Sequence, residues 1–311
     1  MPADPVSDLI ARVDGANIRR NLFHLSQDPL PFRKVNHTRP GADKCTLDEA
    51  DDFLRGQLES YGYVVEAEAV EVQAFACDTS KPKAHQYSLP AQDDPWFTAY
   101  NLYAGKRGAE LPSEIILFLA HKDSQSWVDS PGAYDNCAGT VAVLEMARVL
   151  AQHETRRSIR FLFCNEEHRP WTSVVAATRA KERGDDLVAI FNIDSLGGKS
   201  DEDLRAGRKT SATLYTEPEG ERFADLMGGV NERYGIGLHH QKVLRQSPGD
   251  DDGSFINAGF PMAVANIGSY PYADPNYHLE SDTPDLVDIE NVVMATRASL
   301  AAGLWVDQNR G

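Results

Sequence analysis

Hydrophobic residues near the start of the chain recur at the three- and four-residue spacing of an α-helix. After Asp4-Pro5, which supplies a cap and a first-turn proline, the apolar positions are Leu9, Ile10, Val13, Ile18, Leu22 and Leu25. A second helical stretch follows the capping-box pattern Thr46-Leu47-Asp48-Glu49 and stops at Gly62. Its apolar positions are Ala50, Phe53, Leu54, Leu58 and Tyr61. The pattern therefore predicts helices in both places.

Beyond residue 62, short apolar runs alternate with stretches of helical periodicity. The run 114–120 is short and almost wholly apolar, which is typical of a strand buried on both faces of a sheet. The predicted strands are 63–72, 97–104, 114–120, 158–164, 187–193, 211–216 and 262–267. The predicted helices are 139–152, 173–183, 217–234 and 288–305. This alternation predicts one α/β domain spanning 1–311, with a mostly parallel central sheet, helices on both faces and no inserted domain.

Composition and charge exclude several classes of protein. The hydrophobic fraction of 41% and charged fraction of 25% are those of a globular chain. Lys and Arg total 31 against 47 Asp and Glu, and the net charge of −16 disfavours nucleic acid or an anionic membrane as a partner. No run approaches the roughly 18–20 apolar residues of a membrane helix.

The N-terminal segment and the cysteines indicate the cellular compartment in which the protein is expected. Residues 1–8 have neither the basic nor the apolar region of a signal peptide. The four cysteines are widely spaced and form no Cys-x-x-Cys pair, which favours reduced thiols over a disulfide framework. We therefore expect a cytoplasmic protein.

Residues of metal-binding type directly follow three of the predicted strands. They are His121, Asp123, Glu166, Glu167 and Asp194, after the strands 114–120, 158–164 and 187–193. Ligands of open α/β sheets bind beyond the carboxyl ends of strands, so these side chains are expected to meet in one crevice. Two further candidates, Asp135 and His278, lie in loops. Any one such residue is usually a turn or cap residue, and only their coincidence favours a metal site.

Several short segments around these residues occur together in a recognisable order. They are His121-Lys-Asp-Ser124, Gly132-Ala-Tyr-Asp-Asn136 with Gly139, Leu144-Glu-Met-Ala-Arg148, Arg160-Phe-Leu-Phe163 before Glu166-Glu167, Asn192-Ile-Asp194, Asp251-Asp-Gly-Ser-Phe255 with Gly259-Phe-Pro261, and Tyr277-His278 with Asp282-Thr283. From about Asn101 to Leu286 the chain thereby resembles the co-catalytic dizinc exopeptidases. That family contains bacterial leucyl aminopeptidases, glutamate carboxypeptidase and, more distantly, glutaminyl cyclases.

The resemblance implies a role for each candidate residue. His121 and Asp194 would bind one metal ion, Glu167 and His278 the other, and Asp135 both. Glu166 would be the general base. Asp123 would hold the ring of the first histidine. The resemblance also makes Asp135–Asn136 a candidate for a cis peptide bond.

The charge of the donor set independently favours two ions. Three ligand carboxylates contribute −3, which two divalent ions and one bridging hydroxide neutralise, whereas a single ion would leave the donor set negative beside Glu166. Imidazole and carboxylate donors without a thiolate suit zinc, and would also accept cobalt or manganese.

The expected function is zinc-dependent hydrolysis of amide bonds in small peptides, as an aminopeptidase. Glu166 and the overall acidity favour a substrate ammonium, whereas the candidate anchors for a substrate carboxylate, Arg169, Lys242 and Arg245, are expected to be solvated surface cations. The alternatives are a carboxypeptidase, a dipeptidase or another amidohydrolase of the family, a glutaminyl cyclase-like transferase, and an inactive binding protein with this fold.

Other site chemistries have weaker support. No Gly-x-Ser-x-Gly elbow occurs, and no base marks Cys137 or Cys164 as a nucleophile, so Cys137 is expected to be a small buried residue. We expect a turn at Asp250-Asp251-Asp252 and a solvated or structural pair at His239-His240. The stretch 168–173 lacks the glycines that the family often has and contains Trp171, which predicts a reshaped substrate pocket.

Overall fold

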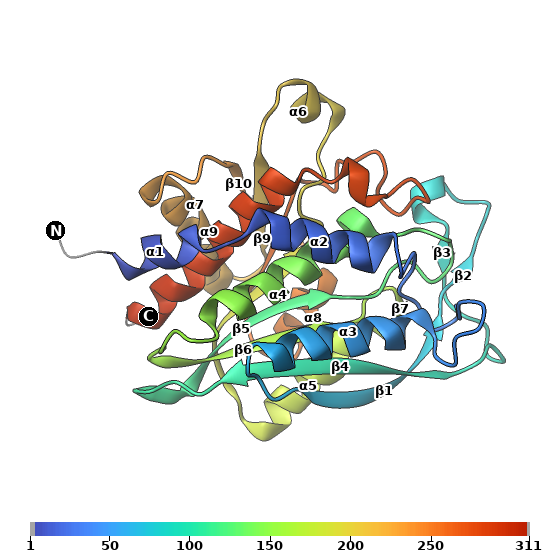
Figure 1. The fold of residues 1–311 in the computed structure, drawn as a ribbon, viewed down its shortest axis with the longest axis horizontal. Coiled ribbons are helices and arrows are strands. Elements are labelled where there is room, and N and C mark those ends of the chain that lie inside the picture. The colour runs from blue at the N-terminus through green and yellow to red at the C-terminus, as the bar shows by residue number, and fades with distance from the viewer. Residues whose placement is uncertain (1–3, 310–311) are drawn as a thin grey trace.

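The computed structural model describes residues 4–309, which surround a nine-stranded sheet of order β10-β9-β11-β8-β5-β6-β4-β1-β7 (Figure 1). The strands of this sheet are β1 Glu66–Ala74, β4 Phe97–Lys106, β5 Leu111–His121, β6 Arg157–Cys164, β7 His168–Arg169, β8 Asp186–Asp194, β9 Thr210–Tyr215, β10 His239–Leu244 and β11 Ala263–Ile267. A separate two-stranded ribbon pairs β2 Ala76–Cys77 with β3 Tyr87–Ser88. It projects from the end of the molecule opposite the termini (Figure 1).

The centre of the sheet is parallel and its two sides are mixed. The neighbouring strands β6, β5, β8 and β11 run parallel. β4 is antiparallel to β6, β1 to β4 and β7 to β1, while β9 is antiparallel to β11. The α/β class is confirmed. The parallel strands place their carboxyl ends together at one edge of the sheet, as the sequence pattern requires.

Side chains of β5 explain why the run 114–120 is apolar throughout. Ile116, Phe118 and Ala120 pack in the larger core cluster, and the alternating Ile115, Leu117 and Leu119 pack in a second one on the opposite face. Both faces are covered by helices, so both sets of side chains are removed from water. Gly303 allows one covering helix to approach closely, because a Cβ there would lie 2.2 Å from the ring of Phe118.

Helices cover the two faces unequally. Figure 1 looks onto the face covered by the helices of the larger core, with α5 and α8 behind the sheet. The larger set is α1 Pro5–Ala11, α2 Gly15–Ser26, α3 Thr46–Ser60, α4 Ala138–Leu150, α7 Pro218–Arg233 and α9 Ile289–Gln308. The smaller set is α5 Thr172–Arg183 and α8 Asp250–Asn257. Helices on both faces confirm the predicted architecture, and within 4–309 no helix combines the length and hydropathy needed to cross a membrane.

Local predictions are wrong in two places. The cap of α3 is Cys45, whose Sγ accepts from the amide of Asp48, while the hydroxyl of Thr46 contacts the backbone of Lys34 instead. Asp250-Asp251-Asp252 is not a turn but the first turn of α8, where negative charge is favourable at the helix N-terminus. The hydrophobic pattern also does not reveal β2, β3, β7, β10 and the short helices α6 Asp201–Arg205, η1 Lys83–His85 and η3 Pro284–Leu286.

Candidate metal centre

The candidate ligands gather where the central parallel strands end. His121 and Asp194 are the last residues of β5 and β8, and Glu167 follows the end of β6. Asp135 lies in the turn η2, Ala133–Cys137, just before α4, and His278 lies in the loop after β11. All five side chains belong to residues that are at most 8% exposed. Buried imidazoles and carboxylates need partners, so this grouping points to a cation site.

The five residues form two donor clusters that share Asp135. His121 Nε2 lies 3.3 Å from Asp135 Oδ1 and 3.4 Å from Asp194 Oδ1. His278 Nε2 lies 3.1 Å from Asp135 Oδ2 and 3.4 Å from Glu167 Oε1. Donors about 2.0–2.1 Å from a tetrahedral ion are separated by about 3.3 Å. The histidine–carboxylate distances of both clusters are therefore compatible with a tetrahedral metal ion such as zinc.

Hydrogen bonds orient both imidazoles toward the clusters. Nδ1 of His278 donates to the carbonyl oxygen of Ala84 at 2.9 Å, and Nδ1 of His121 donates to Asp123 Oδ1 at 3.2 Å. These contacts leave the Nε2 lone pairs available for a metal ion. Burial lowers the pKa of His121, but hydrogen bonds with the surrounding aspartates outweigh burial and raise it well above its usual value. The same negative surroundings favour any cation at this place.

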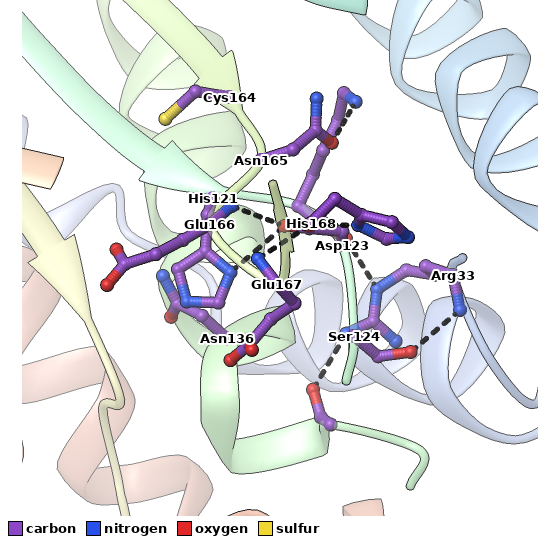
Figure 2. A network of polar contacts seen from close by, with 12 residues as sticks. Arg33, His121, Asp123, Ser124, Asn136, Cys164, Asn165, Glu166, Glu167 and His168 are labelled. Atoms are coloured by element: carbon purple, nitrogen blue, oxygen red, sulfur yellow. Dashed lines mark hydrogen bonds and ion pairs between the residues drawn. The ribbon is translucent and has the colours of Figure 1, made fainter. Parts of the chain in front are cut away.

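Asp123 organises the end of β6 as well as the ring of His121 (Figure 2). Its buried carboxylate accepts the backbone amides of Glu166 at 3.0 Å and Glu167 at 2.8 Å, and Nδ1 of His168 at 2.7 Å. Burial would raise its pKa, but the hydrogen bonds from the two histidines lower it. Asp123 is therefore an anionic acceptor that connects a candidate ligand to the turn carrying both glutamates.

Glu166 and Glu167 point in different directions although they are adjacent (Figure 2). Glu167 Oε1 faces His278, whereas Glu166 Oε2 is buried and has no hydrogen-bond partner among the described residues. Burial raises the pKa of Glu166 well above its usual value, and the charges of Asp251 and Asp250 add to the effect. A buried carboxyl group with a raised pKa beside a cluster of candidate ligands is a candidate for a general acid–base role.

Several residues that position this site have no signal in the sequence pattern. Gln125 Nε2 donates to Asp135 Oδ2 at 2.9 Å and to Glu167 Oε1 at 3.2 Å. Arg33 is fully buried and donates to carbonyl oxygens at Lys122 and Gly132, which joins the two ends of the loop between β5 and η2 (Figure 2). Their partners are distant in sequence, so no local pattern could reveal these contacts.

The loop containing Asp135 is fixed from several directions. The Asp135–Asn136 peptide bond is cis, as the family resemblance suggested. Asn136 donates from Nδ2 to the carbonyl oxygen of Ile193, and its Oδ1 accepts the amides of Gly139 and Ser195. Asp282 accepts the amides of Tyr134 at 2.7 Å and Asp135 at 3.0 Å. These bonds hold the shared carboxylate between the ends of β5 and β8.

A cavity of about 160 Å³ opens onto both clusters. Its lining combines candidate ligands with aromatic and acidic side chains, namely Phe75, Tyr87, His121, Trp127, Asp135, Glu166, Glu167, Trp171, Asp194, Asp250, Tyr272, Tyr277 and His278. Trp171, the residue behind the prediction of a reshaped pocket, lies in this lining. At one end, Tyr272 donates its hydroxyl to Asp250 Oδ2 at 2.8 Å and to Asp194 Oδ2 at 3.3 Å.

The cations considered as carboxylate anchors are engaged elsewhere or exposed. Arg245 is not a solvated surface cation, because its side chain is only 10% exposed and pairs with Asp250 and Asp252. Lys242 pairs with Glu221 and Asp225 on the surface. Arg169 is exposed on β7. None of the three lines the cavity.

The remaining alternatives for metal and thiol chemistry lie outside the cavity. His240 is partly buried and its Nδ1 contacts the hydroxyl of Ser211, whereas His239 is exposed, so this pair is structural and solvated as expected. Cys137 is fully buried, which confirms its interpretation as a small core residue. Cys164 is also buried, and its thiol donates to Asp251 Oδ2 at 3.0 Å.

Comparison of the sequence with known proteins identifies related metalloenzymes. A protein described as a probable zinc metalloprotease from Pyrenophora tritici-repentis is 28% identical over 261 residues, which cover 79% of this chain and 50% of the relative. Leucine aminopeptidase 1 from Sclerotinia sclerotiorum is 24% identical over 200 residues, which cover 60% of this chain and 51% of the relative. The chain thus spans about half the length of these curated relatives.

Solved structures share the fold. The LapA aminopeptidase of Legionella pneumophila superposes with a TM-score of 0.73 at 18% identity, covering 99% of this chain and 75% of that chain. A glutaminyl cyclase of Bacteroides thetaiotaomicron gives a TM-score of 0.68 at 17% identity, covering 96% of this chain and 99% of that chain. The sequence model of Peptidase family M28 matches residues 101–302, the part of the chain that contains both donor clusters. This chain therefore belongs to peptidase family M28.

Proposed function

We propose that the protein is a zinc-dependent exopeptidase that removes N-terminal residues from small peptides. The observation that carries this proposal is the pair of buried donor clusters that share Asp135, beside a Glu166 carboxylate with no hydrogen-bond partner for Oε2 among residues 4–309. Membership of the peptidase family supports it, as do relatives described as a zinc metalloprotease and a leucine aminopeptidase.

His121 and Asp194 would hold one ion, Glu167 and His278 the other, and Asp135 both. The donor spacing supports this assignment, since each imidazole lies 3.1–3.4 Å from two carboxylate oxygens. The absence of thiolate from these two clusters favours zinc, with cobalt or manganese as substitutes. Two such ions, when bound, supply the Lewis acidity that polarises a peptide carbonyl and acidifies a water molecule.

Glu166 would act as the proton carrier. Its free carboxylate oxygen can take a proton from the attacking water and later deliver that proton to the nitrogen of the leaving amine. The proton is conserved over the cycle, and one water is consumed for each peptide bond. Asp123 would keep Glu166 in place through its backbone amide, while Glu167 remains directed toward His278.

The charges around the cavity favour a substrate with a free N-terminus. Five of the lining residues are carboxylates, namely Asp135, Glu166, Glu167, Asp194 and Asp250. Two divalent ions would offset four of those charges, and Arg245 pairs with Asp250 from outside the lining. A substrate ammonium is easily accommodated in such surroundings, whereas a substrate carboxylate would lack a free cation in the lining.

We also propose a cytoplasmic location. The four cysteines are free thiols, and two of them are buried in the core. Free thiols are typical of proteins in a reducing compartment.

The proposal is tested by incubating metal-loaded protein with a panel of dipeptides and aminoacyl-arylamides and identifying the products by mass. The expected result is release of free N-terminal amino acids, which disappears in Glu166→Gln. Cyclisation of N-terminal glutamine without hydrolysis would favour a glutaminyl cyclase-like transferase. Tight peptide binding without any product would favour an inactive binding protein.

A further inference from the structure

Three aromatic side chains form one wall of the cavity, which we call the aromatic wall: Phe75, Tyr87 and Trp127. The ring centroids of Phe75 and Trp127 are 5.9 Å apart, and those of Tyr87 and Trp127 are 5.2 Å apart. The His278 ring lies 5.1 Å from Trp127. Phe75 and Tyr87 lie outside residues 101–302, which match the peptidase family. The wall is therefore partly built by a segment that the family match does not include.

Hydrogen bonds link this segment to His278 and Glu167, two of the candidate ligands of the second cluster. The carbonyl oxygen of Ala84 accepts from His278 Nδ1, and Lys83 pairs with Glu280 at 2.9 Å. The amide of Phe75 donates to Ser126 Oγ at 2.9 Å, and this hydroxyl donates to the carbonyl oxygen of Glu167 at 2.6 Å. The wall is thus held in a fixed position beside His278 and Glu167.

The cavity is acidic beside the first cluster and bounded by the aromatic wall beside the second. Asp250 and Tyr272 lie beside Asp194, which belongs to the first cluster, and the Tyr272 hydroxyl contacts both carboxylates. The aromatic wall lies against His278, which belongs to the second. If the substrate ammonium is held at the acidic end, the chain beyond the scissile bond extends toward the wall.

We infer that the aromatic wall binds an apolar side chain of the residue that follows the scissile bond. The inference rests on the proposed aminopeptidase function and specifies its substrate class: peptides whose second residue is aromatic or aliphatic. Aromatic rings offer a large rigid apolar surface and favourable edge or offset contacts with another ring. Discrimination between apolar and polar side chains in such pockets is on the order of tenfold or more.

The decisive experiment separates binding from turnover by using the zinc-loaded Glu166→Gln protein. Calorimetry should show alanyl-phenylalanine and alanyl-leucine binding at least about tenfold more tightly than alanyl-serine. Trp127→Ala and, separately, Tyr87→Ser should remove most of that preference, and Trp127→Phe should retain it. Tyr87 is 39% exposed, so its replacement should not prevent folding. Zinc content and the thermal unfolding midpoint are measured for each variant.

A matched control is Trp96→Ala, because Trp96 is 57% exposed and does not line the cavity. It should leave the preference unchanged. Equal affinity for the three dipeptides, or a preference that follows only the N-terminal residue, would overturn the inference. If active protein cleaves no peptide while the Trp127-dependent preference in binding persists, the wall assignment stands and the peptidase proposal falls. If the protein cleaves peptides without this preference, the peptidase proposal stands and the wall assignment falls.

Discussion

His168 and Asp123 form a buried pair, with Nδ1 of the imidazole 2.7 Å from Oδ2 of the carboxylate. The backbone amide of Val35 donates to Nε2 of the same ring at 3.3 Å, so Nε2 must be an acceptor and Nδ1 must carry the proton. His168 is thereby a neutral donor in a fixed tautomer. Asp123 in turn accepts from Nδ1 of His121 and from the backbone amides of both glutamates, so His168 is connected to them through this carboxylate.

His168→Ala should therefore weaken the site although His168 is not a candidate ligand. Loss of this partner leaves the amide of Val35 buried and unpaired, which costs about 1–3 kcal/mol of folding free energy. Loss of a partner of this kind typically lowers metal affinity or activity by about 10–100-fold. The measurements are kcat and the zinc dissociation constant. His168→Asn, which keeps a donor, should recover part of the lost activity and zinc affinity. If kcat and zinc affinity were unchanged in both His168→Ala and His168→Asn, His168 would not be a positioning residue.

Metal removal should inactivate the enzyme and destabilise the fold. Ions that bind only the folded state raise the unfolding midpoint, so chelation should lower it and zinc, cobalt or manganese should restore it. Elemental analysis should find close to two ions per chain. Asp135→Ala should lose both ions because it removes the shared donor. His278→Ala should weaken the binding of chiefly one ion. Full activity in metal-free protein would refute the metallopeptidase proposal.

Glu166→Gln should separate metal binding from proton transfer. The amide is nearly isosteric with the carboxyl group but cannot accept the proton of water, so kcat should fall by a factor of about 10²–10⁴. Zinc content should remain unchanged, because Glu166 belongs to neither donor cluster. Glu167→Gln is the matched control, since it should reduce zinc affinity as well as turnover. Near-normal kcat in Glu166→Gln would mean that another group accepts the proton.

The predictable part of this structure consists of elements whose signal is local. The apolar run of β5 and the strand-end position of His121 follow from sequence alone, because burial on both faces leaves a continuous hydrophobic stretch. By contrast, β10 has no such signal because it is an edge strand with largely exposed polar side chains. The acidic start of helix α8 resembles a turn in sequence. It is helical because tertiary contacts stabilise it, including the ion pairs of Arg245, and these contacts have no local signal.

Within the candidate site, residue types are predictable and partners are not. The roles expected for His121, Asp135 and His278 come from motifs resembling a known family. His168 and Gln125 have no such signal, because their contacts join segments far apart in the chain. Only the folded structure brings Val35, Asp123 and His168 together.

The buried cysteines should be unreactive in the native protein. Burial raises the pKa of Cys137 to about 11 and that of Cys164 well above its usual value, so little thiolate is present at neutral pH. Cys77 is exposed and should be labelled first. Iodoacetamide should therefore leave native enzyme largely active, with peptide mapping locating the adduct at Cys77. The control is Cys77→Ser, which should remove this first adduct, and rapid inactivation with labelling of Cys137 would instead indicate a reactive thiol at the site.

The partners of the cations near the cavity predict which end of a peptide the protein should recognise. A carboxypeptidase needs a free arginine or lysine to bind the substrate carboxylate, but Arg245 is occupied by Asp250 and Asp252, and neither Arg169 nor Lys242 lines the cavity. A terminal ammonium would instead lie near the carboxyl groups of Asp250 and Glu166, which line the cavity. We therefore expect N-acetylation of a good dipeptide substrate to reduce kcat/KM by at least about tenfold, whereas C-terminal amidation should change it little.

The measurement is initial-rate kinetics on the free, N-acetylated and C-amidated forms of one peptide. Efficient cleavage of the N-acetylated form together with refusal of the amide would reverse the assignment, and Arg245→Ala would then show whether this arginine can leave its aspartates to bind the substrate.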